Sequence, residues 1–156
     1  MPFDRAVVST PGGERMFSLF GEPTKLHATA AQTGGSIGIW ESEIPPGRGV
    51  GRHRHTREDE VFYVLAGTFR FSCGDEEHVL GQGGCIALPR NVFHAWVNIG
   101  ETPGRLLSIV TPGGFEEFFL AAESRGLKPP EDAAALAELE ASFGVPDSAF
   151  LPLVTG

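Results

Sequence analysis

Three side chains of metal-binding type fall within eight residues of the chain. His53, His55 and Glu60 lie in a stretch rich in arginine and glycine, and an apolar segment follows directly. Side chains alternate between the two faces of an extended backbone, so His53 and His55 share a face. Glu60 lies an odd number of residues beyond His55, and it returns to that face only if the chain turns in the polar segment 56–59. This stretch therefore predicts two imidazoles and a carboxylate that converge from neighbouring strands, as in a metal site.

A fourth candidate ligand, His94, lies in a second segment, residues 83–98. Three of the five histidines of the chain fall in these two segments. Imidazole and carboxylate together suit Fe, Mn, Co, Ni or Zn, and the absence of cysteine from this set disfavours a structural zinc site. Four protein ligands on a six-coordinate metal leave two positions free for water, oxygen or substrate. The set therefore favours a metal that binds something besides the protein.

The two segments resemble the paired sequence motifs of the cupin superfamily. The first motif is matched in full by Gly47, His53, His55, Glu60 and Gly67. The second is matched by Gly83, Pro89, His94 and Asn98. Asn91 stands where the family usually has glycine, and asparagine also tolerates a left-handed turn conformation.

The resemblance implies an all-β fold, a double-stranded β-helix or jelly-roll barrel with six strands in each sheet. It implies one divalent transition metal (Fe, Mn, Ni, Co or Zn) inside the barrel, held by His53, His55, Glu60 and His94. The whole chain also looks like small single-domain bacterial cupins of the quercetin-dioxygenase type. That likeness implies a dioxygenase acting on a small, aromatic or enolic (flavonol-like) compound, with Glu60 as both ligand and general base.

Two other functions stay open. One is a non-redox, metal-dependent isomerase, lyase or cyclase, which an anaerobic assay separates from an oxygenase. The other is a cupin that binds a small molecule without turning it over, because a barrel and a metal do not by themselves make a catalyst.

Alternation also predicts which apolar side chains lie beside the metal. Phe62 and Val64 face the same way as Glu60, and Trp96 faces the same way as His94. These three side chains are expected either to form an apolar substrate-binding pocket or simply to fill the barrel.

Four further charged or titratable residues are not expected to be ligands. His27 and His78 match no motif position and are expected to be surface or packing residues. Arg52 and Arg54 alternate with the two histidines, which predicts that they lie on an outer, salt-bridged face.

The elements that must position these residues are many short strands followed by two helices. Strands bounded by Gly, Pro or Asn recur at roughly eight-to-twelve-residue spacing, which favours a sandwich or barrel over about residues 15–112. Residues 1–14 are expected to be an arm or a short edge strand. The apolar pattern then changes to helical spacing over about 114–125 and about 130–143. Its apolar residues are Phe115, Phe118, Phe119 and Ala122 in the first helix and Leu136, Leu139 and Phe143 in the second.

Length and charge limit the remaining possibilities. The 156 residues fit one domain, 1–156, and the 12 basic and 20 acidic residues give a net charge of −8, which disfavours nucleic acid and anionic membranes as partners. No apolar run approaches the ~20 residues that span a bilayer, so a cytoplasmic protein is expected. Many cupins pair through an edge strand, and a homodimer is expected on that resemblance.

Cys73 and Cys85 are isolated, which favours small buried filler over a disulfide.

Overall fold

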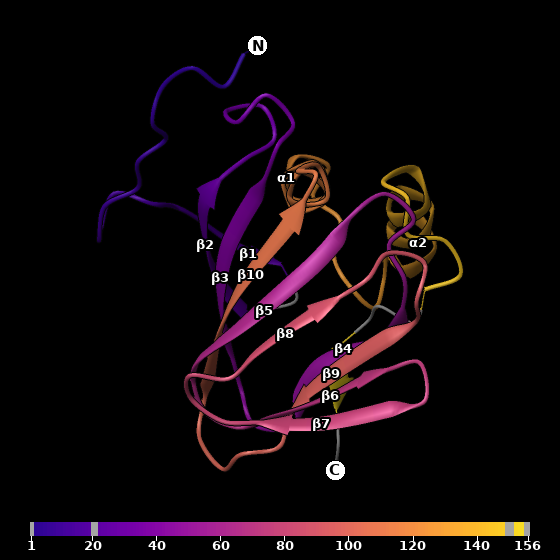
Figure 1. Ribbon diagram of the computed structural model, residues 1–156. Helices are drawn as coiled ribbons and strands as arrows, with labels where there is room; N and C mark the ends of the chain where they lie inside the picture. Colours follow the sequence, from indigo (N-terminus) through magenta and orange to yellow (C-terminus); the bar gives the residue numbers. More distant parts are fainter. Residues whose placement is uncertain (1, 20–21, 149–151, 155–156) are drawn as a thin grey trace.

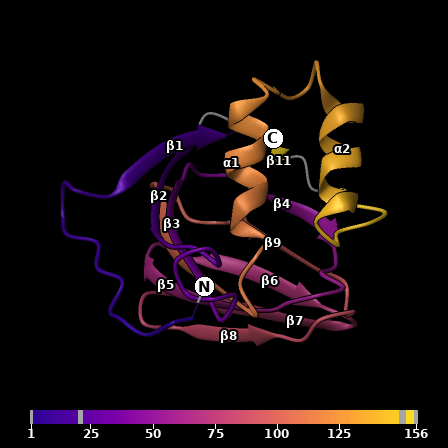
Figure 2. The ribbon, with the colours of Figure 1, turned by 90° about the horizontal axis from the view of Figure 1, so that it is seen from above.

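Two antiparallel sheets that face each other form the body of the protein (Figure 1). The computed structural model describes residues 2–19, 22–148 and 152–154. Two helices follow the strands and lie together at one end of the barrel (Figure 2). This is the jelly-roll, double-stranded β-helix arrangement that the sequence predicted.

The larger sheet has six strands, all paired antiparallel, in the order β1-β2-β3-β10-β5-β8. These strands are β1 (Arg15–Leu19), β2 (Glu22–Ala28), β3 (Gly38–Ile44), β10 (Gly104–Thr111), β5 (Asp59–Ala66) and β8 (Cys85–Leu88). The described residues before β1 form no strand, as expected of an arm.

The smaller sheet has five strands among the described residues, in the order β11-β4-β9-β6-β7. These are β11 (Pro152–Val154), β4 (Arg48–His53), β9 (His94–Asn98), β6 (Phe69–Cys73) and β7 (Glu76–Leu80). The expectation of six strands in each sheet was therefore wrong for this sheet. Its edge strand β11 was also not predicted, because three residues after two helices carry too little pattern to indicate a strand.

Both predicted helices are present, with shorter bounds than expected. Helix α1 spans Glu116–Ser124 and helix α2 spans Ala133–Ser142. Helix α2 begins later than residue 130 because a turn precedes it, in which the Asp132 carboxylate accepts a hydrogen bond from the Lys128 N–H at 2.8 Å. Among the described residues no helix is long and apolar enough to cross a membrane.

The apolar core has two parts, one inside the barrel and one under the helices. The first contains Ile44, Phe62, Val64, Phe69, Phe71, Leu88, Trp96 and Leu106. The second joins the inner face of the larger sheet to both helices through residues that include Phe17, Leu26, Trp40, Phe115, Phe118, Phe119 and Leu136. Full burial stabilises the fold by about 1.5–3 kcal/mol for each large apolar side chain. The helices therefore complete the core and close one end of the barrel.

The two cysteines differ from the expectation of buried filler. Both are free, Cys73 is half-buried and Cys85 is exposed. Cys85 lies on β8, the edge strand of the larger sheet, and its side chain alternates outwards there. Sequence alone could not show which face of this short strand is covered.

Close packing of β4 against β9 depends on a glycine. A Cβ atom on Gly49 would lie 2.0 Å from the Trp96 carbonyl oxygen, a backbone atom that cannot move away cheaply. We predict that Gly49→Ala lowers the free energy of unfolding by about 2 kcal/mol or more in urea titrations. Gly81→Ala is the control, because a Cβ atom there meets nothing within 4 Å. Equal stability of the two variants would contradict this packing.

Candidate metal centre

Four buried side chains from three strands and one loop meet between the two sheets. His53 ends β4, His94 begins β9, and the two residues are direct partners in the β4–β9 pairing. Glu60 comes from β5 in the opposite sheet, and His55 lies in the loop between β4 and β5. One ligand atom from each residue lies within 4.8 Å of the others. The structure thus brings together all four side chains that the sequence singled out as ligands.

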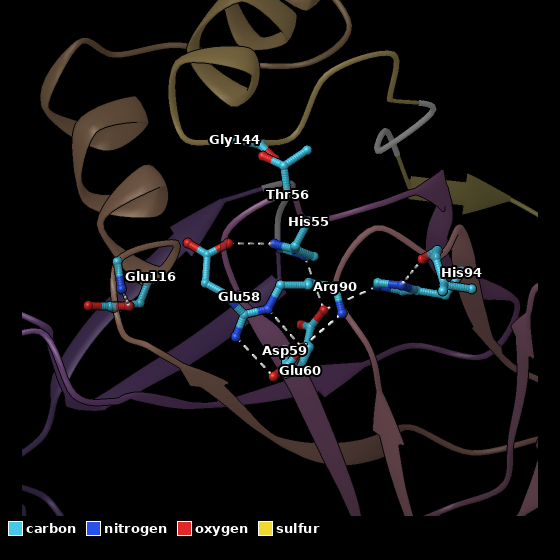
Figure 3. A network of polar contacts seen from close by, with 11 residues as sticks. His55, Thr56, Glu58, Asp59, Glu60, Arg90, His94, Glu116 and Gly144 are labelled. Atoms are coloured by element: carbon cyan, nitrogen blue, oxygen red, sulfur yellow. Dashed lines mark hydrogen bonds and ion pairs between the residues drawn. The ribbon is translucent and has the colours of Figure 1, made fainter.

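The loop that carries His55 is fixed from both sides, and Figure 3 shows one of these sides, the contact between Thr56 and Gly144. The Asn91 N–H donates to the His55 carbonyl oxygen at 2.7 Å, and Asn91 adopts the left-handed conformation expected of it, with φ of 67°. The next residue, Thr56, donates its N–H and its hydroxyl to the Gly144 carbonyl, each at 2.8 Å. The turn that follows α2 therefore holds this histidine in place.

Glu60 lies at the middle of the cluster. Its Oε2 atom is 3.1 Å from His55 Nε2 and 3.2 Å from His94 Nε2. The His53 ring is 4.3 Å from the His94 ring, between centroids. The carboxylate and the imidazole Nε2 atoms thus converge on one point.

Outer partners set the orientation of each imidazole. His53 Nδ1 lies 2.8 Å from the Gly51 carbonyl oxygen, and His94 Nδ1 lies 3.2 Å from the Val92 carbonyl oxygen. A carbonyl only accepts, so Nδ1 donates in both rings, which turns the Nε2 atoms towards the cluster. His55 Nδ1 faces the Glu58 carboxylate at 3.4 Å. Metal-binding histidines commonly have such partners.

Several atoms of the cluster are buried without an aligned hydrogen bond. They are His55 Nδ1, His55 Nε2 and Glu58 Oε2. Buried polar atoms left in this way destabilise a fold. A divalent cation among the Nε2 atoms and the Glu60 carboxylate would compensate for this cost. The three nitrogens and one carboxylate oxygen present here are a suitable ligand set for such an ion.

The electrostatics of the cluster also suit a cation. Burial, together with the neighbouring His94 and His55, lowers the pKa of His53 to about 3. Burial would also lower the pKa of His55, but Glu60 and Glu58 outweigh that effect and raise it to about 9. Burial raises the pKa of Glu60, yet His55 and His94 together hold it well below its usual range. At neutral pH one imidazolium thus neutralises one carboxylate, and a metal ion would take the place of that proton.

A cavity adjoins the cluster inside the barrel. The enclosed part of the cavity measures about 50 Å³, and the whole hollow, which includes its open mouth, measures about 560 Å³. His53 and Glu60 form part of the cavity wall. Phe62 and Trp96 line it as predicted, whereas Val64 does not and is fully buried in the barrel core. Since each water needs roughly 10–15 Å³ on this measure, the enclosed part holds a few waters, and a larger ligand would also occupy the open mouth.

The polar part of this cavity was not predicted from the sequence. Its polar lining residues outside the cluster lie on the inner face of the larger sheet: Glu22 and Thr24 on β2, Ser42 on β3 and Ser108 on β10. A sequence pattern indicates such residues at Ser108, because Ser108 occupies an inward position between the apolar Leu106 and Val110. Alternation of side chains along each strand places this set on the inner face.

The two remaining histidines lie outside the cluster, as expected. His27 Nδ1 is 2.6 Å from Ser9 Oγ, so His27 ties the N-terminal arm to β2. His78 is exposed beside Glu76.

The two arginines of the outer face differ from expectation in their partners. Arg52 and Arg54 face away from the cluster, but they stack on Phe93, with guanidinium carbons 3.6 Å and 4.8 Å from the ring centroid. Within the described part of the chain neither arginine forms an ion pair with a carboxylate. The expected salt bridges are therefore replaced by cation–π contacts.

The cluster predicts a single dominant metal site. We expect the purified chain to hold one divalent ion, and His94→Ala to lose most of it, because a ligand from β9 is removed. Elemental analysis measures the metal per chain, and the rise in Tm on adding Mn²⁺ or Zn²⁺ gives a second measure. His78→Ala is the control and should behave as the native chain. Undiminished metal content in His94→Ala would contradict the site.

Glu58 is expected to support the metal site through His55. Glu58→Gln should weaken metal affinity about 10–100-fold, as loss of a carboxylate behind a ligating histidine usually does. Competition with a chromophoric chelator measures this affinity. Asp59→Asn, at the next residue, is the matched control, because Asp59 is half-exposed and pairs with Arg90 outside the cluster. Equal affinities for the two variants would show that Glu58 does not act on the site.

Comparison with known proteins agrees with this geometry. Residues 40–110 match the family model for the cupin domain. SchB of Streptomyces halstedii is 32% identical over 84 residues, which are 54% of this chain and 59% of SchB. The chain thus spans less than two thirds of the length of this relative.

Solved structures show the same fold at low identity. KdgF from Halomonas sp. superposes with a TM-score of 0.64 at 18% identity, over 72% of this chain and 99% of that one. Pac13, described as a nucleoside dehydratase, gives 0.57 at 18% identity, over 72% of this chain and 88% of that one; it is from Streptomyces. The motifs, the barrel and the match of residues 40–110 to the cupin domain model together show a cupin-type fold.

Proposed function

We propose that this chain is a metal-dependent enzyme that acts on a small oxygen-bearing organic compound, with dioxygenase-like chemistry on an aromatic or enolic substrate as the first candidate. The observation that carries the proposal is the convergence of four buried donor atoms within 4.8 Å at the wall of a cavity. A purely structural metal site has no need of an adjoining cavity.

The protein residues have distinct roles in this proposal. His53, His55, Glu60 and His94 would hold the metal, which would supply Lewis acidity and, if redox-active, electron transfer. Phe62 and Trp96 form apolar walls that would orient a planar substrate and exclude water. Phe115 packs edge-on against the His55 ring, with centroids 4.5 Å apart, and keeps solvent from the helix side of the cluster.

A second candidate is a non-redox lyase, isomerase or cyclase. It is favoured by the polar inner-face residues, since Glu22, Thr24 and Ser42 offer proton donors and acceptors that an oxygenase pocket does not require. The small cavity also favours a compact substrate over a full flavonol. Pac13, which is described as a nucleoside dehydratase, has a barrel of the same fold.

Measurement of oxygen consumption separates these candidates. Protein purified from its own organism, with its metal content known, would be assayed against enolic and polyhydroxylated aromatic compounds in air and without oxygen. Turnover with oxygen uptake supports the dioxygenase, and equal turnover without oxygen supports the non-redox enzyme. Binding without turnover under both conditions would leave a ligand-binding protein and contradict both enzymes.

Glu60 provides a direct test of the site in turnover. We predict that Glu60→Ala abolishes turnover while some metal remains on the three histidines. A cation beside Glu60 keeps its pKa low, so we expect its role as a ligand to outweigh any role as a base. Glu43→Ala on the exposed face of β3 is the control. Full activity of Glu60→Ala would overturn the proposed role.

We also propose that the chain forms a homodimer. The strands β1, β8, β11 and β7 lie at the edges of the two sheets, and exposed edges can pair with a second copy. Sedimentation analysis decides this point, and a single species at 16.7 kDa would contradict it.

A further inference from the structure

Glu22 is half-buried and lines the barrel cavity, away from the candidate metal centre. It begins β2, and in the larger sheet β3 and β10 separate β2 from β5, which carries Glu60. This separation is three strand steps, or about 14 Å along the sheet. Both carboxylates nevertheless line the same cavity. The cavity therefore has two acidic groups, of which only Glu60 belongs to the metal cluster.

The surroundings of Glu22 leave one oxygen of its carboxyl group unsatisfied. Its Oε1 atom is buried and has no hydrogen-bond partner among the described residues. The nearby hydroxyls of Thr24 and Ser42 lie 3.3 Å apart and bond to each other. A carboxyl group held in this way weakens the fold. Such local costs are typical of groups kept for function.

Among the titratable groups that line the cavity, Glu22 is the one that changes charge near neutral pH. Burial raises the pKa of Glu22 to about 7, and Arg48 on β4 opposes this rise. The pKa of His53 is lowered to about 3 and that of Glu60 lies well below its usual range, so neither titrates between about pH 5 and 8.5. Glu22 can therefore both give up and accept a proton in this range.

We propose that Glu22 is an acid–base group of the cavity and that, with Thr24 and Ser42, it binds a hydroxyl group of the ligand. In its neutral form Glu22 donates its proton to a ligand oxygen, and as a carboxylate it accepts the proton of a ligand hydroxyl. The proton moves between two oxygens and no other bond changes. The proposal deepens the proposed function, since it defines the substrate as a hydroxylated compound that reaches from the metal side to β2.

Phenol and toluene are suitable probes, because they differ by a hydroxyl in place of a methyl group. Binding of each to the full chain would be measured by NMR titration from pH 5.5 to 8.5, as purified and again after a chelator has removed the metal. Phenol itself ionises near pH 10, as tyrosine does, and stays neutral over this range. In the native chain the preference for phenol over toluene should rise about fivefold through pH 7, as Glu22 becomes a charged acceptor.

Two variants decide the assignment. In Glu22→Gln the preference should no longer change with pH, whereas in Glu140→Gln it should change as in the native chain. Glu140 is a matched control, because burial also raises its pKa to about 7 but it does not line the cavity. Infrared spectra provide a readout without a ligand, since one carboxylic-acid band that disappears near pH 7 should be missing in folded Glu22→Gln.

Other results would overturn the proposal. One such result is a preference for phenol over toluene that does not change with pH in the native chain. The others are a pH-dependent preference that persists in Glu22→Gln, and no binding of phenol. A pH step present only before chelation would assign the effect to the metal and would also overturn it. The test does not require turnover or a native metal, so failure of the proposed function would leave its result interpretable.

Discussion

The burial of one carboxylate among three imidazoles is the constraint on which this structure depends. Removing Glu60 and its partners from water is costly unless their charges and lone pairs are matched. The backbone supplies part of that match, through carbonyls that hold His53 and His94 by Nδ1. The Nε2 atoms then converge where only a cation or shared protons can balance them. The pairing of β4 with β9 and the position of β5 in the opposite sheet provide the geometry that this balance requires.

The helices contribute to the same arrangement from outside the barrel. The turn after α2 accepts both hydrogen bonds of Thr56, and Phe115 at the start of α1 covers the His55 ring. The C-terminal segment is therefore part of the support of the cluster, although it contributes no ligand. This arrangement couples the folding of the helices to the geometry of the site, since His55 lies in a loop and has no strand to fix it.

The sequence was sufficient to predict which four side chains converge between the sheets, because their identity and spacing are informative. It also placed Phe62 and Trp96 correctly, since alternation along a strand needs no knowledge of the fold. The sequence did not predict exposure or strand pairing where these depend on which other element of the fold lies beside the residue. Cys85 is exposed because its strand is an edge, and β11 forms because a short C-terminal segment meets β4. The inward Glu22 was missed for the same reason, because its face is defined only once β2 is placed beside β3.

The central claim is that three imidazoles and one carboxylate bind a single divalent metal between the sheets. X-ray absorption spectroscopy at the edge of the bound metal tests it most directly. The account predicts scattering from three imidazoles and additional oxygen ligands at about 2.0–2.2 Å. A spectrum with oxygen neighbours alone, or with sulfur ligands from Cys73 or Cys85, would place the metal elsewhere and contradict the account.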